Sequence, residues 1–213
     1  MSSVRRAAVP VALLALLVPL AGCTGDASSP SSSPATTRAA DEGTPLADVD
    51  TSALVVRRAP FCDLVDPSAV TRALGKEASG VSVRRSGQRT KITGGDGGGV
   101  TDVVHEFGCT WRAGGSRAEA WVFVPPVTRQ RARVLVGLAR ARTGCAQVAG
   151  ASAYGDPSVA TSCRADRGVE VSYRGLFGDA WLACSLSAPR GEQETLTRRA
   201  GEWCAAVASA SAG

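Results

Sequence analysis

The fold class follows from residues 159–186, which read VATSCRADRGVEVSYRGLFGDAWLACSL. Three short runs rich in Val, Tyr, Trp and Leu occupy residues 159–164, 169–174 and 180–186. Turn residues separate them, Asp166-Arg167-Gly168 in the first gap and Gly178-Asp179 in the second. This alternation of strand-forming runs and turns predicts three antiparallel strands that form a meander.

Helical patterns stand on both sides of this meander. Residues 192–209 predict a helix with the apolar stripe Leu196, Ala200, Trp203, Cys204 and Val207. Residues 128–142 predict another, capped by Thr128, with the apolar face Val134, Leu135, Leu138 and Ala141. Nearer the N-terminus, Asp66-Pro67 is typical of a helix start and Gly75 of a helix end.

Further strand patterns occupy residues 81–92, 103–111 and 119–124. The glycine-rich stretch 94–99 predicts a hairpin loop, and it is not a P-loop because no Gly-Lys-Ser/Thr follows it. The resulting order is helix, three strands, helix, three strands, helix. It predicts an α+β fold, an antiparallel sheet with packed helices.

Seven cysteines in 213 residues indicate an oxidising compartment. Without Cys23, which has another role proposed below, six remain, and an even number in an exported domain predicts disulfides. In a meander, Cys163 and Cys184 lie about 10 Å apart, beyond the reach of about 7 Å that a disulfide allows. Many connectivities stay open, and the preferred pairs are Cys62–Cys109, Cys145–Cys163 and Cys184–Cys204.

The N-terminus has the pattern of an export signal. Arg5 and Arg6 precede an apolar run over residues 9–20, which is too short for a membrane-spanning helix of about 20 residues. The run ends in Leu20-Ala21-Gly22-Cys23, which resembles the bacterial lipobox, so residues 1–22 are expected to be a lipoprotein signal peptide. The resemblance implies that diacylglycerol is attached to Cys23. The alternative is an ordinary secreted protein with an unmodified Cys23.

Residues 23–58 are rich in Ser, Pro, Thr, Ala and Asp and lack aromatic residues. Such a composition predicts a flexible, disordered spacer, with a reach of roughly 30 Å. Leu54-Val55-Val56 is a candidate start of structure at its end. The α+β extracytoplasmic domain is expected to occupy residues 59–213.

Two motifs support a family resemblance: Cys62-Asp63-Leu64 leading into a short helix that ends in Leu74-Gly75, and Cys109-Thr110-Trp111. Together with the lipobox and spacer they resemble the domain-of-unknown-function 3558 family of actinobacterial lipoproteins. The pattern also resembles extracellular sensor domains of mycobacterial-type kinases, which are disulfide-stapled α+β domains. Neither resemblance implies a catalytic residue or a defined ligand.

The inventory of catalytic groups is sparse. His105 is the single histidine, and no Gly-x-Ser-x-Gly elbow is present. No Cys-x-x-Cys pair suggests a zinc site, and no pair of acidic residues stands out. The sequence therefore predicts no catalytic residue, no metal and no cofactor.

Arginine supplies most of the positive charge, and the net charge of +5 is weak support for any partner. No nucleic-acid partner is expected. The helix over residues 128–142 carries candidate anion-binding residues, whose alternative role is a solvated helix face: Arg129, Arg131, Arg133, Arg140 and Arg142.

Two classes of function remain. The first is a non-catalytic binding, sensing or scaffolding module on the outer face of the cell membrane, anchored through Cys23, with an unidentified cell-wall, lipid or protein partner. The alternative is an envelope hydrolase or accessory enzyme. A deep pocket with convergent carboxylates would favour the enzyme, and a shallow groove would favour the module.

Overall fold

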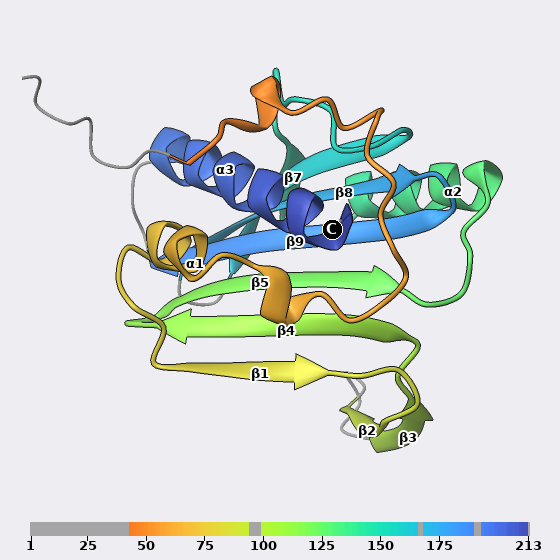
Figure 1. The fold of residues 1–213 in the computed structure, drawn as a ribbon. Helices are drawn as coiled ribbons and strands as arrows, with labels where there is room; N and C mark the ends of the chain where they lie inside the picture. The colour runs from red at the N-terminus through yellow and green to blue at the C-terminus, as the bar shows by residue number, and fades with distance from the viewer. Residues whose placement is uncertain (1–42, 94–98, 166–167, 190–192, 213) are drawn as a thin grey trace, which may run out of the picture. The chain divides into compact units, whose positions relative to one another are not determined.

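A computed structural model describes residues 43–93, 99–165, 168–189 and 193–212 (Figure 1). Cys23, the expected signal peptide and the first part of the expected spacer lie outside these residues. So do the loop at 94–98 and the turn residues Asp166 and Arg167.

The described residues form the predicted α+β fold. One antiparallel sheet has the strand order β1-β4-β5-β9-β8-β7-β6. Its strands are β1 (Gly80–Arg84), β4 (Glu106–Ala113), β5 (Ser116–Phe123), β6 (Cys145–Gln147), β7 (Ser158–Ala165), β8 (Gly168–Phe177) and β9 (Ala180–Pro189). The predicted meander is β7-β8-β9, which pairs with β4-β5 through β5 and β9. A separate hairpin consists of β2 (Arg89–Thr93) and β3 (Gly99–Val103).

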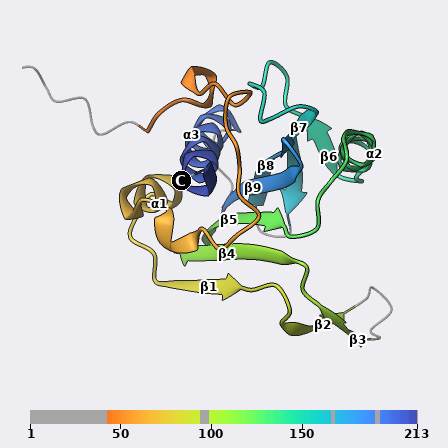
Figure 2. The same ribbon diagram turned by 45° about the vertical axis from the view of Figure 1, so that its right-hand side comes forward.

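Helices pack on both faces of the sheet (Figure 2). One face packs against α1 (Pro67–Leu74) and α3 (Gln193–Ala212), and the other against α2 (Arg129–Arg140). Alternation along β9 supplies both faces: Leu182 belongs to the core on the α3 face, and Trp181 to the smaller core under α2.

The α3 stripe is the predicted one, and all five of its side chains are buried. Trp203 meets Trp111 of β4 edge to face, with 5.2 Å between ring centroids. A buried aromatic pair of this kind contributes about 0.5–1.5 kcal/mol beyond the area it buries. This contact fixes the helix to β4, the neighbour of the edge strand β1.

Three disulfides join the pairs preferred from the sequence: Cys62–Cys109, Cys145–Cys163 and Cys184–Cys204. Cys62 belongs to the short 3-10 helix η2 (Cys62–Leu64), so its bond ties the segment before α1 to β4. The other two bonds join β6 to β7 and β9 to α3. Three disulfides fit an oxidising, extracytoplasmic location.

The ends of α1 are those predicted. The Asp66 side chain accepts a hydrogen bond from the Ser68 backbone N–H, and Pro67 opens the helix. Gly75 ends it in the left-handed conformation, at φ 77°, a backbone region that glycine enters without a Cβ clash.

The predicted apolar face of α2 is wrong except for Leu135, which packs against the smaller core. The helix buries Ala132, Val136 and Ala139 against the sheet, whereas Val134 and Leu138 are exposed, with 47% and 61% of their surface accessible. Both sets repeat at helical spacing, so periodicity alone could not choose between them. Two alanines in the buried set indicate a close approach of the helix to the bulky ring of Trp181.

Two predicted strands are each divided in two. Residues 81–92 form β1 and β2, which are separated at residues 85–88, where Gly87 has φ 86°. Residues 103–111 contain the end of β3 and most of β4. The intervening His105 is exposed, and its carbonyl accepts a hydrogen bond from the Val124 N–H. The β2-β3 hairpin interrupts what would otherwise be a simple β1-β4 connection.

The predicted domain start at residue 59 is also wrong. The 3-10 helix η1 (Leu46–Asp48) buries Leu46 in the main core, and Val56 is buried with it. The Arg57 N–H donates to the Ser211 carbonyl, so the segment passes the C-terminal end of α3 (Figures 1 and 2). A composition averaged over residues 23–58 hid these few apolar side chains.

No helix in the part of the chain that the structure describes is both long and apolar enough to cross a membrane.

Candidate ligand-binding groove on the sheet

The sheet face that carries α2 is polar beyond the end of that helix. Alternation places Arg117 and Glu119 of β5 on this face, together with Glu170 and Arg174 of β8. Between these strands, β9 contributes only short side chains there: Ala183, Ser185 and Ser187. Long charged side chains on either side of a strand with short ones leave an open channel above the sheet.

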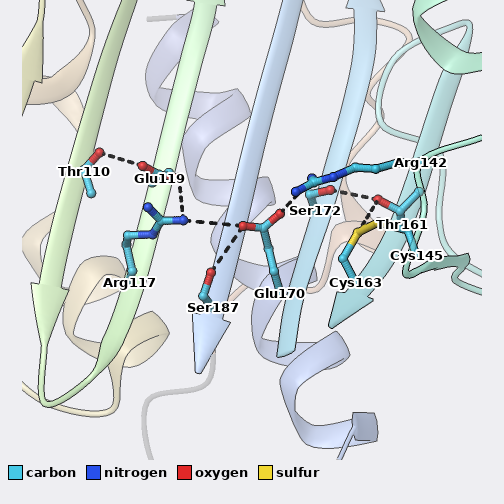
Figure 3. A network of polar contacts seen from close by, with 10 residues as sticks. All are labelled: Thr110, Arg117, Glu119, Arg142, Cys145, Thr161, Cys163, Glu170, Ser172 and Ser187. Carbon is cyan, nitrogen blue, oxygen red and sulfur yellow. Dashed lines mark hydrogen bonds and ion pairs between the residues drawn. A yellow bond between two sulfur atoms is a disulfide. The ribbon is translucent and has the colours of Figure 1, made fainter. Parts of the chain in front are cut away.

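A chain of ion pairs crosses this channel (Figure 3). Nη2 of Arg117 lies 3.4 Å from Oε2 of Glu119 and 3.6 Å from Oε2 of Glu170. Nη1 of Arg142, just beyond the end of α2, lies 3.5 Å from the other carboxylate oxygen of Glu170. Thr110 extends the network to β4, because its hydroxyl donates to Oε1 of Glu119 at 3.0 Å.

Hydroxyl groups complete this surface. Ser187 donates to Oε2 of Glu170 at 3.4 Å, and the hydroxyls of Thr161 and Ser172 share a buried hydrogen bond of 3.0 Å. Figure 3 shows these side chains on neighbouring strands, directed to one side of the sheet. The polar side chains therefore contact one another across neighbouring strands in the absence of a ligand.

Two adjoining cavities lie here, which we call the sheet groove. The polar one, of about 190 Å³, is lined by Glu119, Glu170, Ser172 and Ser185 among others. The apolar one, of about 310 Å³, is lined by Phe123, Leu135, Leu138, Ala139 and Trp181. Three residues line both cavities and mark their junction: Trp121, Arg142 and Arg174.

Arg174 is the most perturbed charge of the groove. Burial lowers the pKa of its guanidinium, the nearby Glu170 carboxylate raises it, and the neighbouring positive charge of Arg142 lowers it. Among the described residues, no carboxylate forms an ion pair with Arg174 within 4 Å. A ligand anion at the junction would offset the free-energy cost of burying the Arg174 charge. It would also reduce the repulsion between the guanidinium groups of Arg142 and Arg174.

The structure separates the arginines that the sequence grouped as anion-binding. All five are exposed, and only Arg142 lines the groove. Arg129 is paired with Asp156. Helical spacing places Arg129, Arg133 and Arg140 on one side of the buried strip of α2, and Arg131 on the other.

Sequence reasoning missed the groove residues on the strands: Arg117, Glu119, Trp121, Glu170 and Arg174. Trp121 is only half-buried, whereas the other three tryptophans are buried. The available signal was a period of two: charges alternate with apolar residues in β5 and β8, and both strands lie inside the sheet.

Two larger cavities lie elsewhere. One, of about 540 Å³, lies between α1 and α3 and includes Gly43, the first described residue. Its Arg199 donates to the Ala73 carbonyl, so this charge already stabilises the helix pair. The other, of about 560 Å³, lies beside β6 and is lined mainly by small and apolar residues. The first cavity also brings opposed charges close to an aromatic ring, but that ring, Trp203, is only 1% exposed, and its Glu202 is already paired with Arg198.

Within the described ranges, no three His, Cys, Asp or Glu side chains are grouped closely enough to hold a metal ion.

Comparison with protein-family models, with curated proteins and with solved structures gave no match. The functional interpretation therefore depends on the groove and on the N-terminal sequence.

Proposed function

We propose that this chain is a lipoprotein, anchored on the outer face of the cell membrane through diacylglycerol on Cys23. Its folded domain is a non-catalytic binding module of the cell envelope, and the sheet groove is its ligand site. The lipobox-like end of the export signal and the three disulfides support the location. The resemblance to the domain-of-unknown-function 3558 lipoproteins agrees with it.

The observation that carries the binding role is the junction of the two cavities. Arg142 and Arg174 lie there beside the half-buried ring of Trp121. A few convergent polar groups next to an apolar wall are typical of ligand sites. Maintaining two adjacent guanidinium groups, one of them largely buried, costs stability and is explained by an anionic ligand.

One observation favours the alternative, an envelope hydrolase. Oε2 of Glu119 and Oε2 of Glu170 both contact Arg117, so they lie no more than about 7 Å apart, which does not exceed the separation of glycosidase carboxylate pairs. Such a reaction needs the two carboxyl groups to flank the scissile bond. Nη2 of Arg117 contacts both carboxylates and occupies the space between them, so we prefer the binding module.

The anchor is tested with Cys23→Ala in the full-length chain. The variant is expected either to be released into the medium or to remain an unprocessed precursor. Cys23→Ser is expected to give the same result, because a serine cannot form the thioether bond to diacylglycerol. The control Thr24→Ala changes the neighbouring residue and is expected to stay membrane-bound. A Cys23→Ala protein that is processed and still membrane-bound would overturn the anchor.

The binding role is tested by native mass spectrometry of the protein purified from membranes. A small molecule is expected to co-purify with the wild type and to be lost from Arg174→Gln, whereas Arg140→Gln retains it. Retention by Arg174→Gln would rule out the sheet groove as the site. Turnover of that molecule by the wild type, abolished in Glu119→Gln, would establish the hydrolase instead.

A further inference from the structure

We infer that the ligand of the sheet groove is an anionic amphiphile with a carboxylate or phosphate head group and an apolar tail. This inference depends on the proposed binding role and adds the chemical class of the ligand. The head group is placed between Arg142 and Arg174, and the tail against Trp121, Phe123 and Leu138.

The head-group position follows from charge. Arg117 and Arg142 share the Glu170 carboxylate, whereas Arg174 has no ion pair of its own with any residue that the structure describes. The side chain of Glu170 is only 14% exposed, whereas that of Arg142 is 53% exposed and is accessible to a ligand. Planar guanidinium groups bind carboxylate and phosphate oxygens in pairs. An anion between Arg142 and Arg174 would therefore gain charge-assisted hydrogen bonds from both.

The tail position follows from the apolar cavity that begins at the same two arginines. The rings of Trp121 and Phe123 lie side by side, with 5.0 Å between centroids, and both are half-buried. Leu138 on α2 forms the opposite wall and is 61% exposed. A hydrocarbon chain between these walls would remove apolar surface from water, which stabilises by about 25 cal/mol per Å².

Because the polar and the apolar cavity adjoin, ligands that have only a charged group or only an apolar chain fit the groove less well. Inorganic phosphate could occupy the arginines but would leave Leu138 and the aromatic rings exposed to solvent. A neutral amphiphile could cover the apolar walls but would leave Arg174 with only the nearby Glu170 carboxylate, which also pairs with Arg117 and Arg142. Only a molecule that has both an anionic head group and an apolar tail would occupy both cavities.

The test measures binding to the full-length lipidated protein by isothermal titration, below the critical micelle concentration of each probe. The probes are laurate and lauroyl lysophosphatidate, with dodecyl maltoside as the neutral amphiphile and inorganic phosphate as the head group alone. We expect the two anionic amphiphiles to bind at least 10-fold more tightly than either control probe. Comparing laurate with the lysophosphatidate distinguishes the two head groups.

Matched variants locate the site. Arg142→Gln and Arg174→Gln are each expected to weaken lysophosphatidate binding at least 10-fold, and Leu138→Ser at least 3-fold. Arg140→Gln, two residues from Arg142 but outside the groove, leaves it unchanged. Circular dichroism at the titration temperature verifies that each variant is folded.

Equal affinity for dodecyl maltoside would overturn the head-group assignment, and equal affinity for inorganic phosphate would overturn the tail. Unchanged binding in both arginine variants, or no binding of any probe, would overturn the inference as a whole. In the last case, a different molecule co-purifying with the wild type but not with Arg174→Gln would still support the proposed function. The experiment thereby distinguishes a failure of the ligand class from a failure of the proposed binding function.

Discussion

Arg117 on β5 reaches across β9 to Glu170 on β8, with 3.6 Å between Nη2 and Oε2. Ser187 is the β9 residue opposite both of them in the sheet register, and its short side chain makes the crossing possible. Glu170 also pairs with Arg142, so one carboxylate holds two guanidinium groups on either side of the groove. It is at once a structural link and a competitor of any ligand anion.

Glu170→Gln is therefore expected to change stability and ligand affinity in opposite directions. The unfolding free energy should fall by about 1 kcal/mol, since the arginine partners are about half exposed and water screens their ion pairs. Binding of an anionic ligand should tighten at least 3-fold because the competing carboxylate is gone. Urea denaturation and titration calorimetry measure the two effects.

The control for this change is Glu77→Gln, which removes an exposed carboxylate outside the groove. Both quantities should stay at the wild-type value. If Glu170→Gln weakens anion binding while remaining folded, Glu170 itself contacts the ligand and the assignment of its role is wrong.

The disulfide between β9 and α3 should contribute more stability than the one between β6 and β7. Their loop lengths are similar, with separations of 20 and 18 residues, so the entropic contribution is similar, about 3 kcal/mol. Cys184 and Cys204 are buried in the main core, whereas Cys145 lies on a three-residue edge strand and is half-buried. Cys184→Ala/Cys204→Ala should therefore lower Tm further than Cys145→Ala/Cys163→Ala, and the reverse order would contradict this.

Residues before position 59 should contribute to folding stability. Leu46→Ala removes a side chain that is 5% exposed, and the unfolding free energy should fall by about 2 kcal/mol. Val55→Ala, in the same segment, changes a residue that is 75% exposed and should alter it by less than about 0.5 kcal/mol. If guanidinium denaturation shows a negligible change in unfolding free energy for both variants, this segment belongs to the flexible spacer and not to the folded domain.

Two valines on α2 test which face of that helix is buried. Val136→Ala should cost about 1–2 kcal/mol because Val136 is 6% exposed beneath the helix. Val134→Ala makes the same chemical change on the exposed side and should be nearly neutral. Thermal unfolding followed by circular dichroism separates the two, and a larger loss for Val134→Ala would favour the face predicted from sequence.

Local signals predicted those parts of the fold that local interactions determine. The caps at Asp66 and Gly75 fix the ends of α1, and the stripe from Leu196 to Val207 fixes the buried face of α3. The face of α2 was not predictable in this way, because Val134 and Leu138 have the helical spacing but the sheet selects Ala132 and Ala139. Tertiary packing decided between two equally periodic sets.

The groove was less predictable than the fold. Its residues come from β5, β8 and the end of α2, which are far apart in sequence, and they meet only because β9 pairs with both β5 and β8. In the sequence, Arg174 and Glu170 look like ordinary solvent-facing positions of a strand. Arg142 was among the expected anion-binding residues, but its partners could be identified only from the strand order.

The most direct test of the groove as the ligand site is side-chain NMR of the full-length protein, titrated with an extract of the cell envelope. If the groove is the ligand site, the Trp121 indole N–H and the Arg174 Nε–H signals shift, and the Trp203 and Arg57 signals stay unchanged. Shifts confined to Arg57 and Arg199, which line the cavity between α1 and α3, would contradict it, as would the absence of any shift.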